Sequence, residues 1–100
     1  MNGLDLSVNI TKLAADGGTL KSCSDTIDEN IGYIQDMLAK EWYSWLGEDS
    51  DAYVNSLKLM LSNLSKFSQE VHHVGEYMVG LSEKYSDAIE TFEKGVSSDE

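Results

Sequence analysis

The sequence of 100 residues contains no proline, one cysteine and only seven basic residues, all of them lysine. Without proline, no position is barred from the interior of a helix, so long helices are the natural expectation. The single thiol, Cys23, excludes an internal disulfide framework. No stretch approaches the roughly 20 apolar residues that span a membrane as a helix. The first residues also lack the basic and apolar regions of a secretory signal peptide.

The charge balance is strongly acidic, with 18 acidic residues and a formal net charge of -11 at pH 7. Binding to a nucleic-acid backbone requires clustered basic side chains, and anionic membrane surfaces attract such clusters as well. We therefore expect no nucleic-acid partner and no attraction to an anionic membrane. The acidic residues fall on the outward faces of the helices inferred below, where they favour solubility.

The second half of the chain carries two rows of apolar residues at heptad spacing. Apolar residues at the a and d positions of successive heptads form one stripe of an amphipathic helix. Row a consists of Leu57, Leu64, Val71, Met78, Tyr85 and Phe92. Row d consists of Tyr53, Met60, Phe67, Val74, Leu81 and Ala88. They predict a helix over about residues 49–94, followed by a flexible tail at about 95–100.

The first half carries a second apolar stripe, with alternating spacings of four and three residues. Its members are Leu6, Ile10, Leu13, Gly17, Leu20, Ser24, Ile27, Ile31, Ile34 and Leu38. They predict a helix over about residues 8–43. The adjacent glycines Gly17 and Gly18 weaken a helix, so a break there is the alternative to one continuous helix. If the helix continues, Gly17 and Ser24 permit close approach of another helix.

The short link at about residues 44–48 predicts a turn, so the chain forms an all-α, antiparallel helical hairpin with a single domain over residues 1–100. Two helices alone leave part of each stripe exposed to water. A second hairpin that docks on this one usually covers the exposed part, and the two hairpins then form a four-helix bundle with coiled-coil packing. The residues expected in the hairpin and dimer seam are Ile27, Ile31, Ile34, Leu38, Leu57, Met60, Leu64, Phe67, Val71, Val74, Met78 and Leu81.

The predicted turn contains the tripeptide Trp45-Leu46-Gly47. Glycine readily adopts the positive φ that ends a helix, so Gly47 is suited to reverse the chain. Trp45 then lies at the tip of the hairpin, where its large side chain either plugs the end of the bundle or contacts a partner. The triplet alone is a weak signal, but its position between two long stripes gives it weight.

In these features nearly the whole chain resembles the Trp-x-Gly (WXG) family, the Esx-like small proteins of type VII secretion, with Trp45 and Gly47 at the motif positions. The resemblance implies a protein of Gram-positive bacteria that folds in the cytoplasm and forms a homodimer, or a heterodimer with a related hairpin. It would be secreted without a cleavable signal peptide by the type VII ATPase, as a virulence or interbacterial-competition factor. An alternative is an adaptor that pairs with a larger helical toxin or a sister protein and completes its export signal.

The resemblance also places the export-signal region in the second half of the chain. Many family members carry an acid four residues after a tyrosine, whereas here Ile89 follows Tyr85 at that spacing and Glu90 comes one residue later. Other relatives use histidines and acids, and His72 with Glu76 matches the first step of that pattern. We therefore expect a variant signal at these positions, or a signal completed by a partner chain.

The sequence offers no residue set for catalysis, metal binding or cofactor binding. The adjacent histidines His72 and His73 point about 100° apart on a helix, so they cannot bind one metal ion together. Neither a Ser-His-Asp set nor a glycine-rich phosphate loop is present. We therefore expect a protein that is not an enzyme and that uses no cofactor.

Overall fold

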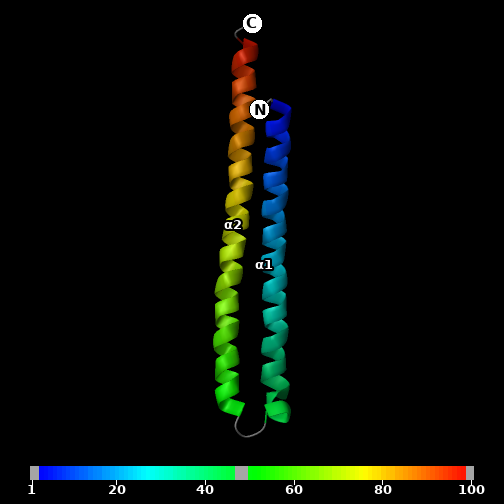
Figure 1. Cartoon of the computed structure of the whole chain (residues 1–100), viewed down its shortest axis with the longest axis vertical. Coiled ribbons are helices and arrows are strands. Elements are labelled where there is room, and N and C mark those ends of the chain that lie inside the picture. Colours follow the sequence, from blue (N-terminus) through cyan, green and yellow to red (C-terminus); the bar gives the residue numbers. More distant parts are fainter. Residues whose placement is uncertain (1–2, 47–49, 99–100) are drawn as a thin grey trace. The chain divides into compact units, whose positions relative to one another are not determined.

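Two long α-helices make up the described part of the chain (Figure 1). This computed structural model describes residues 3–46 and 50–98, with side chains for residues 6–40 and 51–95. Helix α1 spans Gly3–Leu46 and helix α2 spans Ser50–Ser98. The fold is an all-α helical hairpin, as the two apolar stripes predict.

Helix α1 is longer than the sequence pattern suggests. It begins at Gly3 rather than near residue 8, and it ends at Leu46 rather than near residue 43. It also passes through Gly17 and Gly18 without interruption, so the alternative of a break at the two glycines is wrong. Packing against α2 at this point, described below, offsets the low helix propensity of glycine.

Helix α2 begins at Ser50, next to the predicted start, and includes residues 95–98, which the sequence pattern assigns to a tail. Asp51 lies in its first turn, where a negative charge interacts favourably with the positive end of the helix dipole. In the predicted turn, residues 44–46 belong to α1, and residues 47–48 lie outside the described residues.

Side chains that disfavour helices are accommodated within α1 by local hydrogen bonds. Threonine is a poor helix former because its branched side chain loses rotamer freedom. The hydroxyls of Thr11, Thr19 and Thr26 each donate to the carbonyl oxygen four residues earlier, at 3.0, 3.0 and 3.2 Å. Each hydroxyl is therefore satisfied within the helix.

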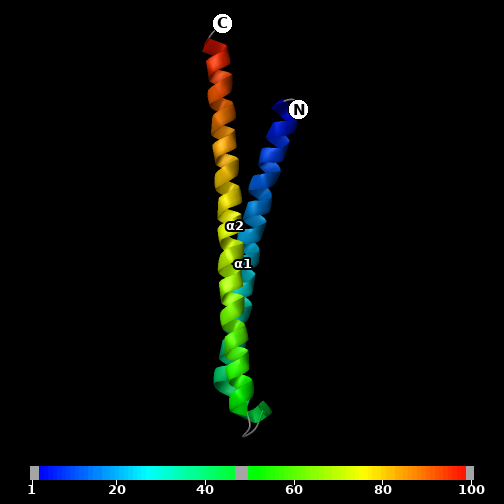
Figure 2. The same ribbon diagram turned by 60° about the vertical axis from the view of Figure 1, so that its left-hand side comes forward.

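The chain divides into two compact units. The terminal unit comprises Met1–Lys21 and His73–Glu100, and the turn unit comprises Ser22–His72. In each unit, a segment of α1 runs antiparallel to a segment of α2 (Figure 1). Within the terminal unit, the two segments move apart toward the N-terminus of α1 (Figure 2). Each unit has its own line of buried residues.

Candidate interaction surface

The residues of α2 that are most deeply buried form a single heptad row, which we call the inner row. Its members are Val54, Leu61, Ser68, Gly75 and Ser82. Only Val54 and Leu61 are apolar and large, and they are 6% and 4% exposed. The hairpin contact therefore relies on small side chains as much as on large ones.

Ser68 lies close to the end of the turn unit, four residues before His72, and it is 1% exposed. Its hydroxyl lies 3.0 Å from the carbonyl oxygen of Ser24 and 2.6 Å from Oδ1 of Asp28, both on α1, and it donates toward both acceptors. A buried hydroxyl without a partner would be costly, so these two contacts stabilise one register of the helices. In that register, Ile31, seven residues after Ser24, lies opposite Leu61, seven residues before Ser68.

Gly17 and Gly75 face each other in the terminal unit at very close range. A Cβ atom on Gly17 would lie 2.8 Å from the carbonyl oxygen of Gly75, and a Cβ on Gly75 would lie 2.6 Å from that of Gly17. Carbon and oxygen atoms in ordinary contact lie at 3.4 Å or more. The close approach that the sequence predicts at Gly17 is thus confirmed, and Gly75 is the partner that makes it possible.

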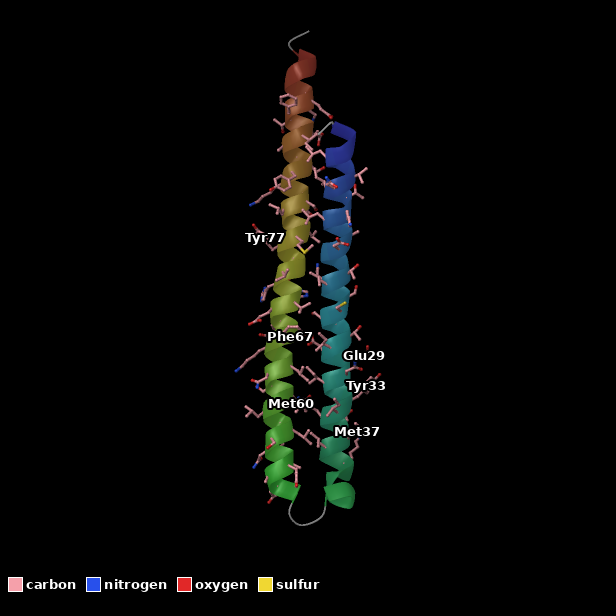
Figure 3. The ribbon with its side chains drawn as sticks, in the orientation of Figure 1. Glu29, Tyr33, Met37, Met60, Phe67 and Tyr77 are labelled. Carbon is pink, nitrogen blue, oxygen red and sulfur yellow. The ribbon has the colours of Figure 1, made fainter. Side chains whose placement is uncertain are left out.

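The apolar rows predicted from the sequence of α2 lie beside this inner row. Row d precedes the inner row by one residue, which turns it about 100° around the helix. Met60 and Phe67 of row d are consequently 57% and 54% exposed, and Met60 projects away from α1 (Figure 3). We call the exposed large side chains of the two rows the α2 stripe. It consists of Tyr53, Met60, Leu64, Phe67, Val74, Tyr85 and Phe92.

The remaining seam residues lie at the border between the hairpin contact and solvent. Ile31 is buried. Those that are half-buried are Ile27, Ile34, Leu38, Leu57, Val71, Met78 and Leu81. The structure thus brings the seam residues of α1 and half of row a, namely Leu57, Val71 and Met78, to the hairpin contact, and it leaves most of row d outside it.

The inner row contains the residues that the sequence pattern missed. Ser68, Gly75 and Ser82 carry no hydrophobic signal, yet they repeat every seven residues. Gly17 and Ser24 of α1 repeat at the same spacing. Matching rows of small residues at heptad spacing are the signal that could have located the contact, because small side chains let two helices approach closely.

The turn motif falls at the edge of the described residues. Trp45 is in the last turn of α1, but its side chain and the whole of Gly47 lie outside the described part. Their predicted roles in the turn therefore stay predictions.

The expected export-signal residues lie on α2, in both units. Tyr85 is half exposed and lines an apolar hollow of about 410 Å³ in the terminal unit, together with Leu6 and Phe92. Oε1 of Glu90 lies 3.0 Å from Nζ of Lys94, in an exposed ion pair one helical turn long. His72 is half-buried and Glu76 is exposed.

No group of three or more potential metal ligands occurs among the described residues. Within the same residues, neither helix has an apolar stretch long enough to cross a membrane. Comparisons of the chain with family models, curated proteins and solved structures found no match. The fold and its exposed stripe define a class: a helical hairpin that carries an uncovered apolar surface on its second helix.

Proposed function

We propose that this protein is a WXG-type helical hairpin that pairs with a second hairpin through the α2 stripe and is exported as a dimer by a type VII secretion system. The observation that carries the proposal is the α2 stripe itself. A continuous row of large apolar side chains on a helix surface is the usual form of a helix-packing interface. Its role is binding, without catalysis.

The exposure of the stripe side chains supports the need for a partner. Met60 and Phe67 are 57% and 54% exposed in the turn unit, and Phe92 is 72% exposed in the terminal unit. Rows of exposed large apolar side chains mark protein–protein interaction sites. A second hairpin on the α2 stripe would cover these side chains.

The heptad pattern of the stripe supports another helix as the covering element. Residues Met60, Leu64 and Phe67 follow the spacing of four and three residues that packs against a parallel or antiparallel helix. The α2 stripe of a second copy presents the same pattern. A homodimer is therefore the simplest form, and a heterodimer with a related hairpin is its closest variant.

The assignment to type VII secretion rests on the resemblance to the WXG family. The hairpin fold is the one that the resemblance implies. Trp45 lies in the last turn of α1, where the family motif is expected. In this proposal the dimer folds in the cytoplasm of a Gram-positive bacterium, and the secretion ATPase recognises it without a cleavable signal peptide. Outside the cell it serves in virulence or in competition between bacteria.

A second candidate function is that of an adaptor for a larger helical toxin or a sister protein. One observation favours it: the position four residues after Tyr85 is occupied by Ile89, and the nearby Glu90 is engaged by Lys94 at 3.0 Å. A partner chain would then supply the acid of the export signal. In this case the α2 stripe packs against the helical domain of the partner.

The deciding experiment is the molar mass of the protein purified alone, measured by size-exclusion chromatography with light scattering. The proposal expects a dimer at micromolar concentration, and a monomer would overturn it. Co-purification with a larger helical chain in fixed stoichiometry would favour the adaptor.

A matched pair of variants tests whether the α2 stripe is the interface. Met60→Glu places a charge in the stripe and is expected to weaken the dimer at least about tenfold, because an unpaired charge cannot be buried cheaply. Asn55→Glu adds the same charge five residues earlier, at an exposed position that lies about 140° around the helix from Met60. This control is expected to remain dimeric. Equal behaviour of the two variants would rule out the stripe as the interface.

A further inference from the structure

A groove in the turn unit has a charge opposite to that of the rest of the chain. It has a volume of about 720 Å³ and lies between α1 and α2, with Leu38, Val54 and Leu61 among its lining residues. Lys58 and Lys66 also line it, and none of its described lining residues is acidic. Acidic residues outnumber lysines by 18 to seven in the whole chain. We call this feature the lysine groove.

The two lysines of the groove are available for binding. Their side chains are exposed, and neither forms an ion pair with a residue in the described part of the chain. By contrast, Lys94 is paired with Glu90 at 3.0 Å. Lys58 and Lys66 are eight residues apart on α2, which corresponds to about 12 Å along the helix. The groove therefore offers two cations beside an apolar floor.

The outer side of α1 in the same unit has the complementary arrangement. Glu29 and Asp36 are exposed and seven residues apart, so they lie on one face about 10.5 Å apart along the helix. Tyr33 and Met37 are 60% and 41% exposed beside them. Figure 3 shows Glu29, Tyr33 and Met37 on the side of α1 away from α2. We call these four residues the acidic face.

One hydrogen bond holds part of the acidic face in place. The hydroxyl of Tyr33 donates to Oε1 of Glu29 at 3.1 Å. This contact joins the aromatic ring and the carboxylate into one surface before any partner arrives. Preorganisation of this kind reduces the entropy lost on binding.

We propose that the lysine groove of one molecule binds the acidic face of a second molecule. Lys58 and Lys66 pair with Glu29 and Asp36 of the second copy, whose Tyr33 and Met37 contact the apolar floor. The two charge pairs have similar spacings along their helices, about 12 Å and about 10.5 Å, and the exposed Tyr33 and Met37 beside the two acids supply the apolar part of this occupant. Long, flexible lysine side chains easily span the small difference.

This contact is separate from the α2 stripe and does not depend on the proposed function. The stripe contains no residue of the groove or of the acidic face. If the stripe forms the dimer, groove contacts join dimers into larger assemblies. Because each copy has a net charge of -11, general repulsion opposes the contact, which therefore forms only at high protein concentration.

The test uses charge reversal at both surfaces, in a Met60→Glu/Phe67→Glu background in which two charges in the stripe oppose pairing through it. The first variant adds Lys58→Glu and Lys66→Glu, and the second adds Glu29→Lys and Asp36→Lys. A control adds Lys12→Glu and Lys84→Glu, which give the same net charge as the first variant outside the groove. Sedimentation equilibrium over a range of concentrations gives the dissociation constant of each protein, and circular dichroism checks its helix content.

The background protein and the control are expected to associate with similar dissociation constants. The first and second variants alone should each associate at least about tenfold more weakly, because like charges then face each other. Mixing them should restore association, since the acidic face of the first fits the lysine groove of the second. Absence of self-association in the background protein, equal weakening in the control, or no recovery on mixing would each overturn the proposal. None of these outcomes depends on whether the stripe forms a dimer.

Discussion

Replacing Gly75 by alanine is expected to lower the free energy of unfolding by up to about 2 kcal/mol, although alanine is the better helix former. In an open helix, the change from glycine to alanine is favourable by about 1 kcal/mol. At Gly75, however, the added Cβ would lie 2.6 Å from the carbonyl oxygen of Gly17 and 2.8 Å from Cγ of Lys21. The lysine side chain can move aside, but the backbone oxygen cannot.

The cost of this clash follows from the distance that must be gained. Ordinary contact begins at 3.4 Å, so the helices must separate locally by about 0.8 Å from the 2.6 Å contact. Forcing an extra methyl group into a tightly packed contact costs about 1 to 3 kcal/mol. Subtracting the gain in helix propensity of about 1 kcal/mol leaves a net loss of up to about 2 kcal/mol.

Gly80 provides the matched control, since it lies on the same helix and a Cβ added there meets no atom within 4 Å. Gly80→Ala should therefore raise the free energy of unfolding by up to about 1 kcal/mol. Urea denaturation followed by circular dichroism measures both variants, at one fixed protein concentration because the stability of an oligomer depends on concentration. If Gly75→Ala were as stabilising as Gly80→Ala, the close contact with Gly17 would not exist in solution.

Four further variants, one of them a control, test other features of the molecule. Ser68→Ala removes the buried hydroxyl that contacts Ser24 and Asp28, and it should cost about 1 to 2 kcal/mol in urea denaturation. The control is Ser62→Ala, at an exposed position of α2, which should change the free energy of unfolding by less than about 0.5 kcal/mol. Lys94→Gln breaks the ion pair with Glu90, whose side chains are 76% and 63% exposed. It should also lower the free energy of unfolding by less than about 0.5 kcal/mol. A larger loss would mean that this pair stabilises the fold more than an exposed ion pair does. If the proposed function holds, Trp45→Ala should leave the proposed dimer intact and reduce the secreted fraction on immunoblots, whereas normal secretion would exclude Trp45 from export recognition.

The sequence predicts the fold class well because both helices are long and strongly periodic. The stripe of α1 contains every residue that the structure buries on that helix in the described part, namely Gly17, Ser24 and Ile31. The prediction works here because the apolar residues and the small ones share one face. Helix ends were predicted less well, because no strong start signal marks Gly3 and because α2 continues past Gly95, a residue type that commonly ends helices.

The contact surface of α2 could not be predicted in the same way. Hydrophobic periodicity identifies the apolar side of a helix, but it does not say which of two neighbouring rows faces the other helix. In α2, the rows with the largest side chains lie next to the inner row, which contains Ser68 and Gly75. Close backbone approach decided the outcome, and close approach depends on the absence of side-chain atoms. The displaced large side chains, such as Phe67, then become the candidate interaction surface.

Gly17 and Gly75 should also be coupled energetically, because an added methyl group at either position needs the same gap between the helices. A Cβ on Gly17 would meet the backbone oxygen of Gly75 at 2.8 Å, and the reverse contact would be 2.6 Å. Once one alanine has moved the helices apart, the second enters a space that is already open and still gains helix propensity. The double variant Gly17→Ala/Gly75→Ala should therefore lose at least about 1 kcal/mol less than the sum of the single losses. Gly18→Ala combined with Gly80→Ala, where both positions are open, should be additive within about 0.5 kcal/mol. Additive losses at Gly17 and Gly75 would mean that the two glycines do not share one gap, and the small-residue contact would no longer explain why the large side chains of α2 face outward.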